Sequence, residues 1–517
     1  MNKLFQMTAS VNPVVKQIVG YTSFVLLTVV AFTVLFMKLS VAMVLGGTFI
    51  LAFLFFMVFY PEAGTLVVTF LIYSNVAVVA YKFHGVPHLA VAAVSLLICV
   101  PFAVYVLVMR EKVVLDYPLL LMFLYLASLL ISSFFAKDIG IALDRIVTFL
   151  MEGLVLYFLL INVIRKVSTL DRVIWAMLIA GTVLGGMTLF QEATTSYNQQ
   201  FWGLAQRNLE YGFDDGSDEV QGNVPHQSKV RRAQRASGPT GDPNRFAQIL
   251  LVLFPLGFFR FLREHSLTAK ILLGLCTLLI LSGVLLTYSR GAFVTIIVLM
   301  IIMTIMRYIK FSYAIGAGIL LLSLILITSP GYFTRMDTIR GVKGLFTTDT
   351  EHQPDSVTRG RVTEMLAAFM VFLDHPLFGV GPGQYTPFYS MSYMSNPDIA
   401  FRRIDTTRRA HTLYFELAAE TGIMGLSVFL LIVFLVVFKL WDIRSRLIKT
   451  QPDLANLATS FILAIAAYLG TAIFLQLSYE RYYWLLLGVA AAAIQVLDPE
   501  KLEKQATATG FAKILKF

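Results

Sequence analysis

The sequence predicts an all-α polytopic membrane protein, and its composition and its apolar runs carry that prediction. Of its 517 residues, 57% are hydrophobic and only 14% are charged, and the mean hydropathy is +0.75. The chain contains about fourteen apolar runs of roughly 18 residues, the length at which a helix crosses a bilayer. Each run must be helical, because lipid offers no partner to an open backbone.

The apolar runs place the membrane spans. We expect about 12 to 14 transmembrane helices. The runs comprise residues 18–37, 41–60, 64–81, 87–109, 117–135, 147–163, 173–190, 244–262, 270–288, 292–308, 311–329, 412–438, 457–476 and 482–496. Cations gather in alternate short turns, such as Arg110 with Lys112 and Arg165 with Lys166. By the positive-inside rule, these turns and the N-terminus face the cytoplasm.

With this topology both long polar loops face outward. The predicted parts are N-terminal transmembrane helices at 1–190, a first long loop at 191–243, transmembrane helices at 244–329, a second long loop at 330–411, C-terminal transmembrane helices at 412–498 and a cytoplasmic tail at 499–517. The first span lacks a cleavage pattern, so we expect no removable signal peptide. Cys99 and Cys276 lie inside spans, which argues against a disulfide framework.

The second long loop is rich in arginine and contains a predicted helix. Between Thr358 and Asp374 apolar residues recur at helical spacing, which predicts an amphipathic helix on the outer membrane face or against the bundle. A turn with glycine at three of its five positions follows at 379–383, where side chains would crowd the backbone. The cations of this loop include Arg359, Arg361, Arg408 and Arg409.

Three cations at span ends on the outer side are the main candidates for chemistry. Arg235 precedes a cluster of turn-forming residues, Arg290 separates two spans, and His411 opens the span after the long loop. Each also has an ordinary explanation, since an arginine can extend to lipid headgroups and a histidine can be interfacial. Together, two guanidinium groups and an imidazole suit a diphosphate leaving group and a hydroxyl that loses its proton.

Other polar features carry less information. The acidic stretch at 214–219 lacks the spacing of a calcium loop, and the tyrosines around Arg481 resemble an interface belt. Glu416 and Glu420 are functional candidates inside a span, or they order neighbouring cations. We expect no metal, no cofactor and no nucleic acid partner, because no motif for any of them is present.

Four sequence blocks resemble the bacterial superfamily of O-antigen ligases and O-antigen polymerases. They occur in the order of that family and run from Arg235 to Asn244, from Thr287 to Ala292, from Asp374 to Gly383 and from His411 to Gly422. Thr412 departs from the pattern, since family members often have asparagine there.

The resemblance implies a metal-independent inverting glycosyltransferase of the bacterial inner membrane, with both long loops and the active site in the periplasm. Its donor would be a glycan on undecaprenyl diphosphate, in the biosynthesis of lipopolysaccharide or exopolysaccharide. Arg235 and Arg290 would bind the diphosphate, and His411 would activate the acceptor hydroxyl. We expect further substrate contacts, to diphosphate or glycan, from Arg359, Arg361, Arg408, Arg409 and Tyr414.

The sequence does not identify the acceptor of the glycan. About fourteen spans favour a polymerase, whose acceptor is a second lipid-linked repeat unit and whose partners can include a chain-length regulator. The alternative is a ligase that transfers the glycan to lipid A-core or to protein. A transporter of lipid-linked sugars is the more distant alternative, because the sequence shows no repeated halves and its notable charges lie in the outer loops and not at mid-membrane.

Overall fold

The structure is a computed structural model that describes residues 51–87, 94–213, 229–310, 356–401, 404, 406–477 and 480–502, with residues 312, 316 and 319. Some predictions fall outside these residues. They are the spans 18–37 and 311–329, the first half of the span 41–60, the acidic stretch 214–219 and the tail beyond residue 502.

The chain forms two compact units. The smaller comprises Met1–Thr65 and Cys99–Lys112, and the larger comprises Leu66–Ile98 and Val113–Phe517. In the smaller unit, helix α7 (Cys99–Ala103) continues into a π-helical turn, η1 (Val104–Val108). Everything that follows on the candidate site concerns the larger unit.

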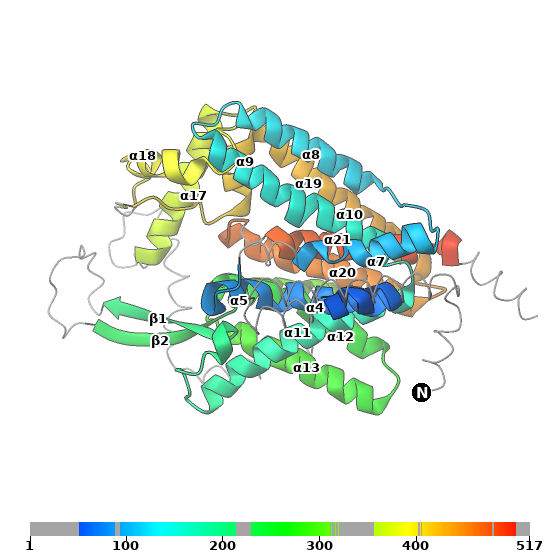
Figure 1. Cartoon of the computed structure of the whole chain (residues 1–517). Helices are drawn as coiled ribbons and strands as arrows, with labels where there is room; N and C mark the ends of the chain where they lie inside the picture. Colours follow the sequence, from blue (N-terminus) through cyan, green and yellow to red (C-terminus); the bar gives the residue numbers. More distant parts are fainter. Residues whose placement is uncertain are drawn as a thin grey trace, which may run out of the picture. The chain divides into compact units, whose positions relative to one another are not determined.

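The described residues are predominantly helical (Figure 1). The other helices are α4 (Pro61–Ser74), α5 (Val76–His84), α8 (Tyr117–Ser133), α9 (Ile139–Thr148), α10 (Leu156–Val163), α11 (Val167–Ala193), α12 (Pro243–Arg263), α13 (Leu267–Leu285), α14 (Arg290–Ile305), α17 (Ser356–Asp374), α18 (Ser390–Met394), α19 (Leu413–Leu447), α20 (Pro452–Thr471) and α21 (Glu480–Val496). A π-helical segment, η2 (Phe149–Val155), joins α9 to α10.

Six described helices are long and apolar enough to cross a membrane, and the bent pair of α4 and α5 adds a seventh if it is one span. The six are Ile139–Val163, Val167–Ala193, Pro243–Arg263, Leu267–Leu285, Leu413–Leu447 and Pro452–Phe474. This confirms the helical, multi-pass membrane class. The total of about fourteen spans stays a prediction.

The larger unit is built around α12 and α19. Helix α12 packs against α13 and α20, while α8 and α17 pack against α19. The local sequence favours a helix start at Pro243. Proline suits the first turn, and the Asp242 carboxylate caps α12 by accepting the backbone N–H groups of Asn244 and Arg245. The core holds fully buried aromatic side chains, among them Phe149, Phe429, Tyr483 and Trp484.

The first long loop contains a β-hairpin, so the all-α prediction is wrong for this segment. Strand β1 (Gln206–Phe213) pairs antiparallel with β2 (Lys229–Gly238). The backbone N–H of Ala236 donates to the carbonyl of Leu286 at 3.0 Å, which ties β2 to the end of α13. These strands are polar, so a search for apolar runs could not distinguish them from loop.

The second long loop forms α17, as its periodicity predicts, and then the short helix α18. Its buried face consists mainly of small and polar residues, including Gly360, Thr363, Ala367 and Ala368, together with Val371. Small side chains let two helices approach closely, and they place α17 against α19. The larger apolar residues of the predicted helix are partly buried or exposed, and Leu373 is 57% exposed.

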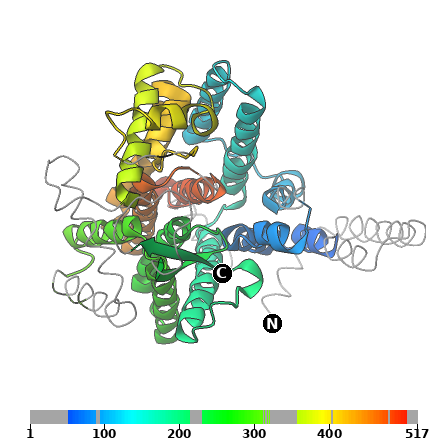
Figure 2. The same ribbon diagram turned by 90° about the vertical axis from the view of Figure 1, so that its left-hand side faces the viewer.

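The hairpin and α17 lie at the same end of the helices, and Figure 2 views the molecule from that end. This is the arrangement expected if both long loops face the same side of the membrane. It brings the Arg235 block next to the second loop, although the two are far apart in sequence.

The glycine turn after α17 docks on a break in α19. The backbone of Gly422 leaves helical geometry at φ 64° and ψ −166°. The N–H groups of Val380 and Gly381 then donate to the carbonyls of Ala419 and Glu420 at 2.9 and 3.0 Å. A Cβ at Gly379 would overlap the backbone of Glu420. The glycines therefore hold α17 against α19.

Candidate functional site

Helix α17 presents a row of polar residues at spacings of three. Thr358, Arg361 and Glu364 lie on neighbouring turns and therefore share one side of the helix. Arg290, the first residue of α14, donates from Nη1 to the hydroxyl of Thr358 at 3.1 Å. Glu364 is 2% exposed and lies toward His411. The row thus joins the start of α14 to the start of α19.

Arg361 lines a small cavity at the starts of two helices. Asn244 comes from the first turn of α12, while Ser289, Gly291 and Ala292 surround the start of α14. The side chain of Ser289 caps α14 by accepting the N–H of Ala292 at 3.4 Å. Because helix N-termini carry partial positive charge, this cavity favours an anion.

His411 lies directly before α19, in the left-handed backbone region at φ 49°. Its Nε2 is 3.5 Å from Oε2 of Glu364, and its side chain is 28% exposed. Among the described residues, Nδ1 is buried and has no hydrogen-bond partner. The structure therefore leaves one ring nitrogen beside a carboxylate and the other without a partner.

Burial and the positive charge of Arg361 lower the pKa of His411 to about 4, with smaller contributions from Arg245 and Arg408. The carboxylate of Asp242 acts in the opposite direction. The imidazole is consequently neutral near pH 7 and has a lone pair that can accept a proton.

Arg408 and Arg235 occupy different positions around this group. Nη1 of Arg408 is 3.6 Å from Oε1 of Glu364, and the arginine side chain is 46% exposed. Arg235 is 6% exposed. It donates to the carbonyl of Thr287 at 2.8 Å and to Oδ1 of Asn244 at 3.0 Å. Arg235 therefore connects β2 to the starts of α12 and α14.

The remaining predicted substrate contacts lie elsewhere. Nε of Arg409 donates to the Glu416 carboxylate at 3.0 Å, and the hydroxyl of Tyr414 donates to the carbonyl of Leu469 on α20 at 3.0 Å. Arg359 lies on α17, where its carbonyl accepts the hydroxyl of Thr363 at 3.2 Å. Arg409 and Tyr414 thus make contacts that hold α19 in place.

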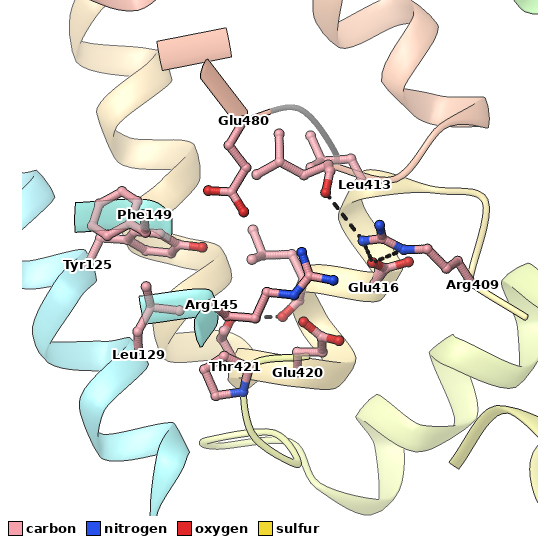
Figure 3. Close-up of a pocket in the computed structure, with 13 residues that line it drawn as sticks. Tyr125, Leu129, Arg145, Phe149, Arg409, Leu413, Glu416, Glu420, Thr421 and Glu480 are labelled. Atoms are coloured by element: carbon pink, nitrogen blue, oxygen red, sulfur yellow. Dashed lines mark hydrogen bonds and ion pairs between the residues drawn. The ribbon is translucent and has the colours of Figure 1, made fainter. Parts of the chain in front are cut away.

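A second charged group surrounds a cavity farther along α19, and Figure 3 shows it. Two arginines and three carboxylates line this cavity, and we call them the α19 cluster: Arg145, Arg409, Glu416, Glu420 and Glu480. Arg145 extends between Glu420 and Glu480, and Arg409 meets Glu416 (Figure 3). The alternative that Glu416 orders a neighbouring cation is therefore the one that the structure supports.

We call the first group the α17 site: Arg290, Arg361, Glu364, Arg408 and His411. Sequence inspection named its arginines and its histidine as candidates but not Glu364. The signal was present, because Glu364 follows Arg361 by three residues and lies off the apolar stripe of the predicted helix. Burial and the approach of His411 are visible only in the folded chain.

The fold and site define a polytopic membrane protein with several arginines and a histidine at one end of its helices. Residues 275–430 match the family model described as O-antigen ligase. This match confirms the resemblance to the O-antigen ligase and polymerase superfamily for that segment, which contains Arg290, Arg361 and His411 but not Arg235. No curated protein matches the chain.

Proposed function

We propose that the chain is a glycosyltransferase that moves an undecaprenyl-diphosphate-linked glycan onto an acceptor hydroxyl at the periplasmic face of the inner membrane. The observation that carries this proposal is the α17 site. Arg290 contacts Thr358 and His411 lies beside Glu364, so both approach α17 on the side of Arg361, and all three lie within the residues that match the family.

In this proposal the diphosphate binds at the start of α14. Arg290 and Arg361 bind its oxygens through charge-assisted hydrogen bonds, and the helix N-terminus adds partial positive charge. The bond from the anomeric carbon to the diphosphate breaks as the acceptor oxygen attacks from the opposite face. The bonding electrons leave on the diphosphate, and His411 takes the hydroxyl proton. No metal is needed, because the arginines offset the developing charge.

Arg235 acts in the proposal as a positioning residue. Its donors to Thr287 and Asn244 hold the two helix starts beside the cavity. This differs from the direct phosphate contact that the family resemblance implies for it.

For the acceptor we favour a second lipid-linked repeat unit, which would make the protein a polymerase. The predicted number of spans supports this choice. Analysis of lipid-linked products in a deletion strain tests it. A polymerase deletion leaves single repeat units on the final acceptor, while a ligase deletion leaves long chains on undecaprenyl diphosphate.

The reaction itself is tested with the purified chain in detergent, supplied with lipid-linked glycan extracted from its deletion strain. We expect Arg290→Ala, Arg361→Ala and His411→Ala to abolish transfer. Arg446→Ala is the matched control, because this arginine pairs with Asp442 at the other end of α19. Near-wild-type rates in the Arg290 and His411 variants would overturn the proposal, and transfer by the wild type without a second compartment would exclude pure transport.

A further inference from the structure

A buried carboxylate beside the histidine has no role in the proposed mechanism so far. Glu364 lies on α17, and its side chain is 3% exposed. Burying a carboxylate is costly unless charged or hydrogen-bonding groups compensate it. Two charged groups lie beside Glu364: His411 at 3.5 Å from Oε2 and Arg408 at 3.6 Å from Oε1.

The backbone around Glu364 is held by two sets of contacts. The hydroxyl of the buried Tyr385 donates to the Glu364 carbonyl at 3.2 Å. The glycine turn fixes the far end of α17 on α19, through the hydrogen bonds of Val380 and Gly381. The carboxylate is therefore held at a set position relative to the start of α19, where His411 lies.

A neutral imidazole carries its proton on one ring nitrogen, and the partner of that nitrogen decides which one it is. In this protein Nε2 faces a carboxylate, which accepts hydrogen bonds, and Nδ1 has no partner among the described residues. Placing the proton on Nε2 directs it toward Glu364 and leaves the lone pair on Nδ1.

We infer that Glu364 is the positioning residue of His411: its carboxylate fixes the ring and holds the proton on Nε2, which leaves the lone pair of the imidazole on Nδ1. That this lone pair serves the transfer reaction rests on the proposed function. A carboxylate that orients a general base through its other nitrogen is a known catalytic arrangement.

The state of His411 can be observed without any substrate. Nitrogen NMR of the full chain in lipid vesicles, with ¹⁵N-labelled histidine, distinguishes protonated from unprotonated ring nitrogens. The chain has seven histidines, and His411→Gln identifies the signal that belongs to His411. We expect the wild type to show the Nε2–H form and Glu364→Gln to show a mixture of both forms.

Transfer kinetics supply the second measurement. Because a misdirected base loses much of its contribution, we expect Glu364→Gln to lower kcat on the order of 100-fold with KM unchanged. Glu364→Asp should keep the Nε2–H form and recover part of kcat. Asp374→Asn is the matched control, since Asp374 is an exposed carboxylate at the end of the same helix and bonds to Tyr393.

The outcomes separate the two proposals. An unchanged tautomer together with unchanged kcat in Glu364→Gln would overturn the inference. If that variant does not accumulate, an altered tautomer with full kcat in Glu364→Asp would overturn it equally. A wild type that shows the Nε2–H form, and a Glu364→Gln that loses it, support the positioning role even if no transfer is detected. Absent transfer would count against the proposed function alone.

Discussion

The α17 site and the α19 cluster are both built from arginines and carboxylates, yet their charge balance differs. In the α19 cluster two arginines face three carboxylates, and Arg409 is paired with Glu416. In the α17 site three arginines accompany one carboxylate, Glu364, and a neutral histidine. The comparison shows that arginine content alone does not mark a binding site. In the cluster the carboxylates outnumber the arginines, while among the five residues of the α17 site the arginines outnumber the carboxylate, which is the composition that favours an anionic ligand.

The largest expected effect is a loss of transfer activity without a loss of folded protein. Arg361→Ala should lower kcat/KM by about 100-fold or more, because the proposed mechanism then loses a preorganised positive charge at the diphosphate. The chain should still insert and accumulate, since the removed charge lies among other cations. The measurement compares transfer rates with membrane yield. A loss of yield that matches the loss of activity would show that Arg361 is structural.

Arg409→Ala should lower the stability of the folded chain, whereas Arg361→Ala should lower its activity. Removing one partner leaves the Glu416 carboxylate, which is 7% exposed, without its counter-charge, at a cost of about 3 kcal/mol. We expect a lower yield and a lower unfolding temperature. The double variant Arg409→Met with Glu416→Leu should recover stability, because an apolar pair of similar size replaces the ion pair. A double variant no more stable than Arg409→Ala would contradict this interpretation.

The histidine offers a smaller and graded test. Removing a nearby positive charge stabilises the protonated imidazole, so Arg361→Gln should raise the pKa of His411 above about 4, and Arg408→Gln should raise it less. NMR titration of the His411 signal measures both shifts. In the wild type, activity that needs the neutral ring should persist at neutral pH and fall as pH drops through about 4. An equal shift in both variants would mean that Arg361 is not the dominant neighbour.

The smallest effect concerns Tyr414. Its hydroxyl donates to the carbonyl of Leu469 within the membrane helices, so Tyr414→Phe should cost about 1 kcal/mol of stability. The transfer rate should not change. A clear rise in KM for the glycan donor would instead return Tyr414 to the substrate contacts that the sequence suggested.

Sequence alone predicted the helical membrane class and the helix in the second loop, and it named Arg290, Arg361, Arg408 and His411 among its candidates. Those features depend on local periodicity and on residue type, which a single sequence displays directly. It missed the hairpin of β1 and β2, because short polar strands resemble loop. It also could not separate Arg361 from Arg409, since that distinction rests on the ion pair of Arg409 with Glu416, which lies seven residues later in α19.

The break at Gly422 also determines how far Glu364 and His411 lie from the point where the glycine turn binds α19. Backbone hydrogen bonds join residues 376–381 to residues 419–424, and from this junction α17 and the start of α19 run back toward Glu364 and His411. Each added residue in α17 would turn Glu364 by about 100° about the helix axis. Insertions near Phe369 should therefore separate the carboxylate from the imidazole. Insertions at 395–400 lie between the glycine turn and the start of α19, which are held by their own contacts, and should change this spacing less.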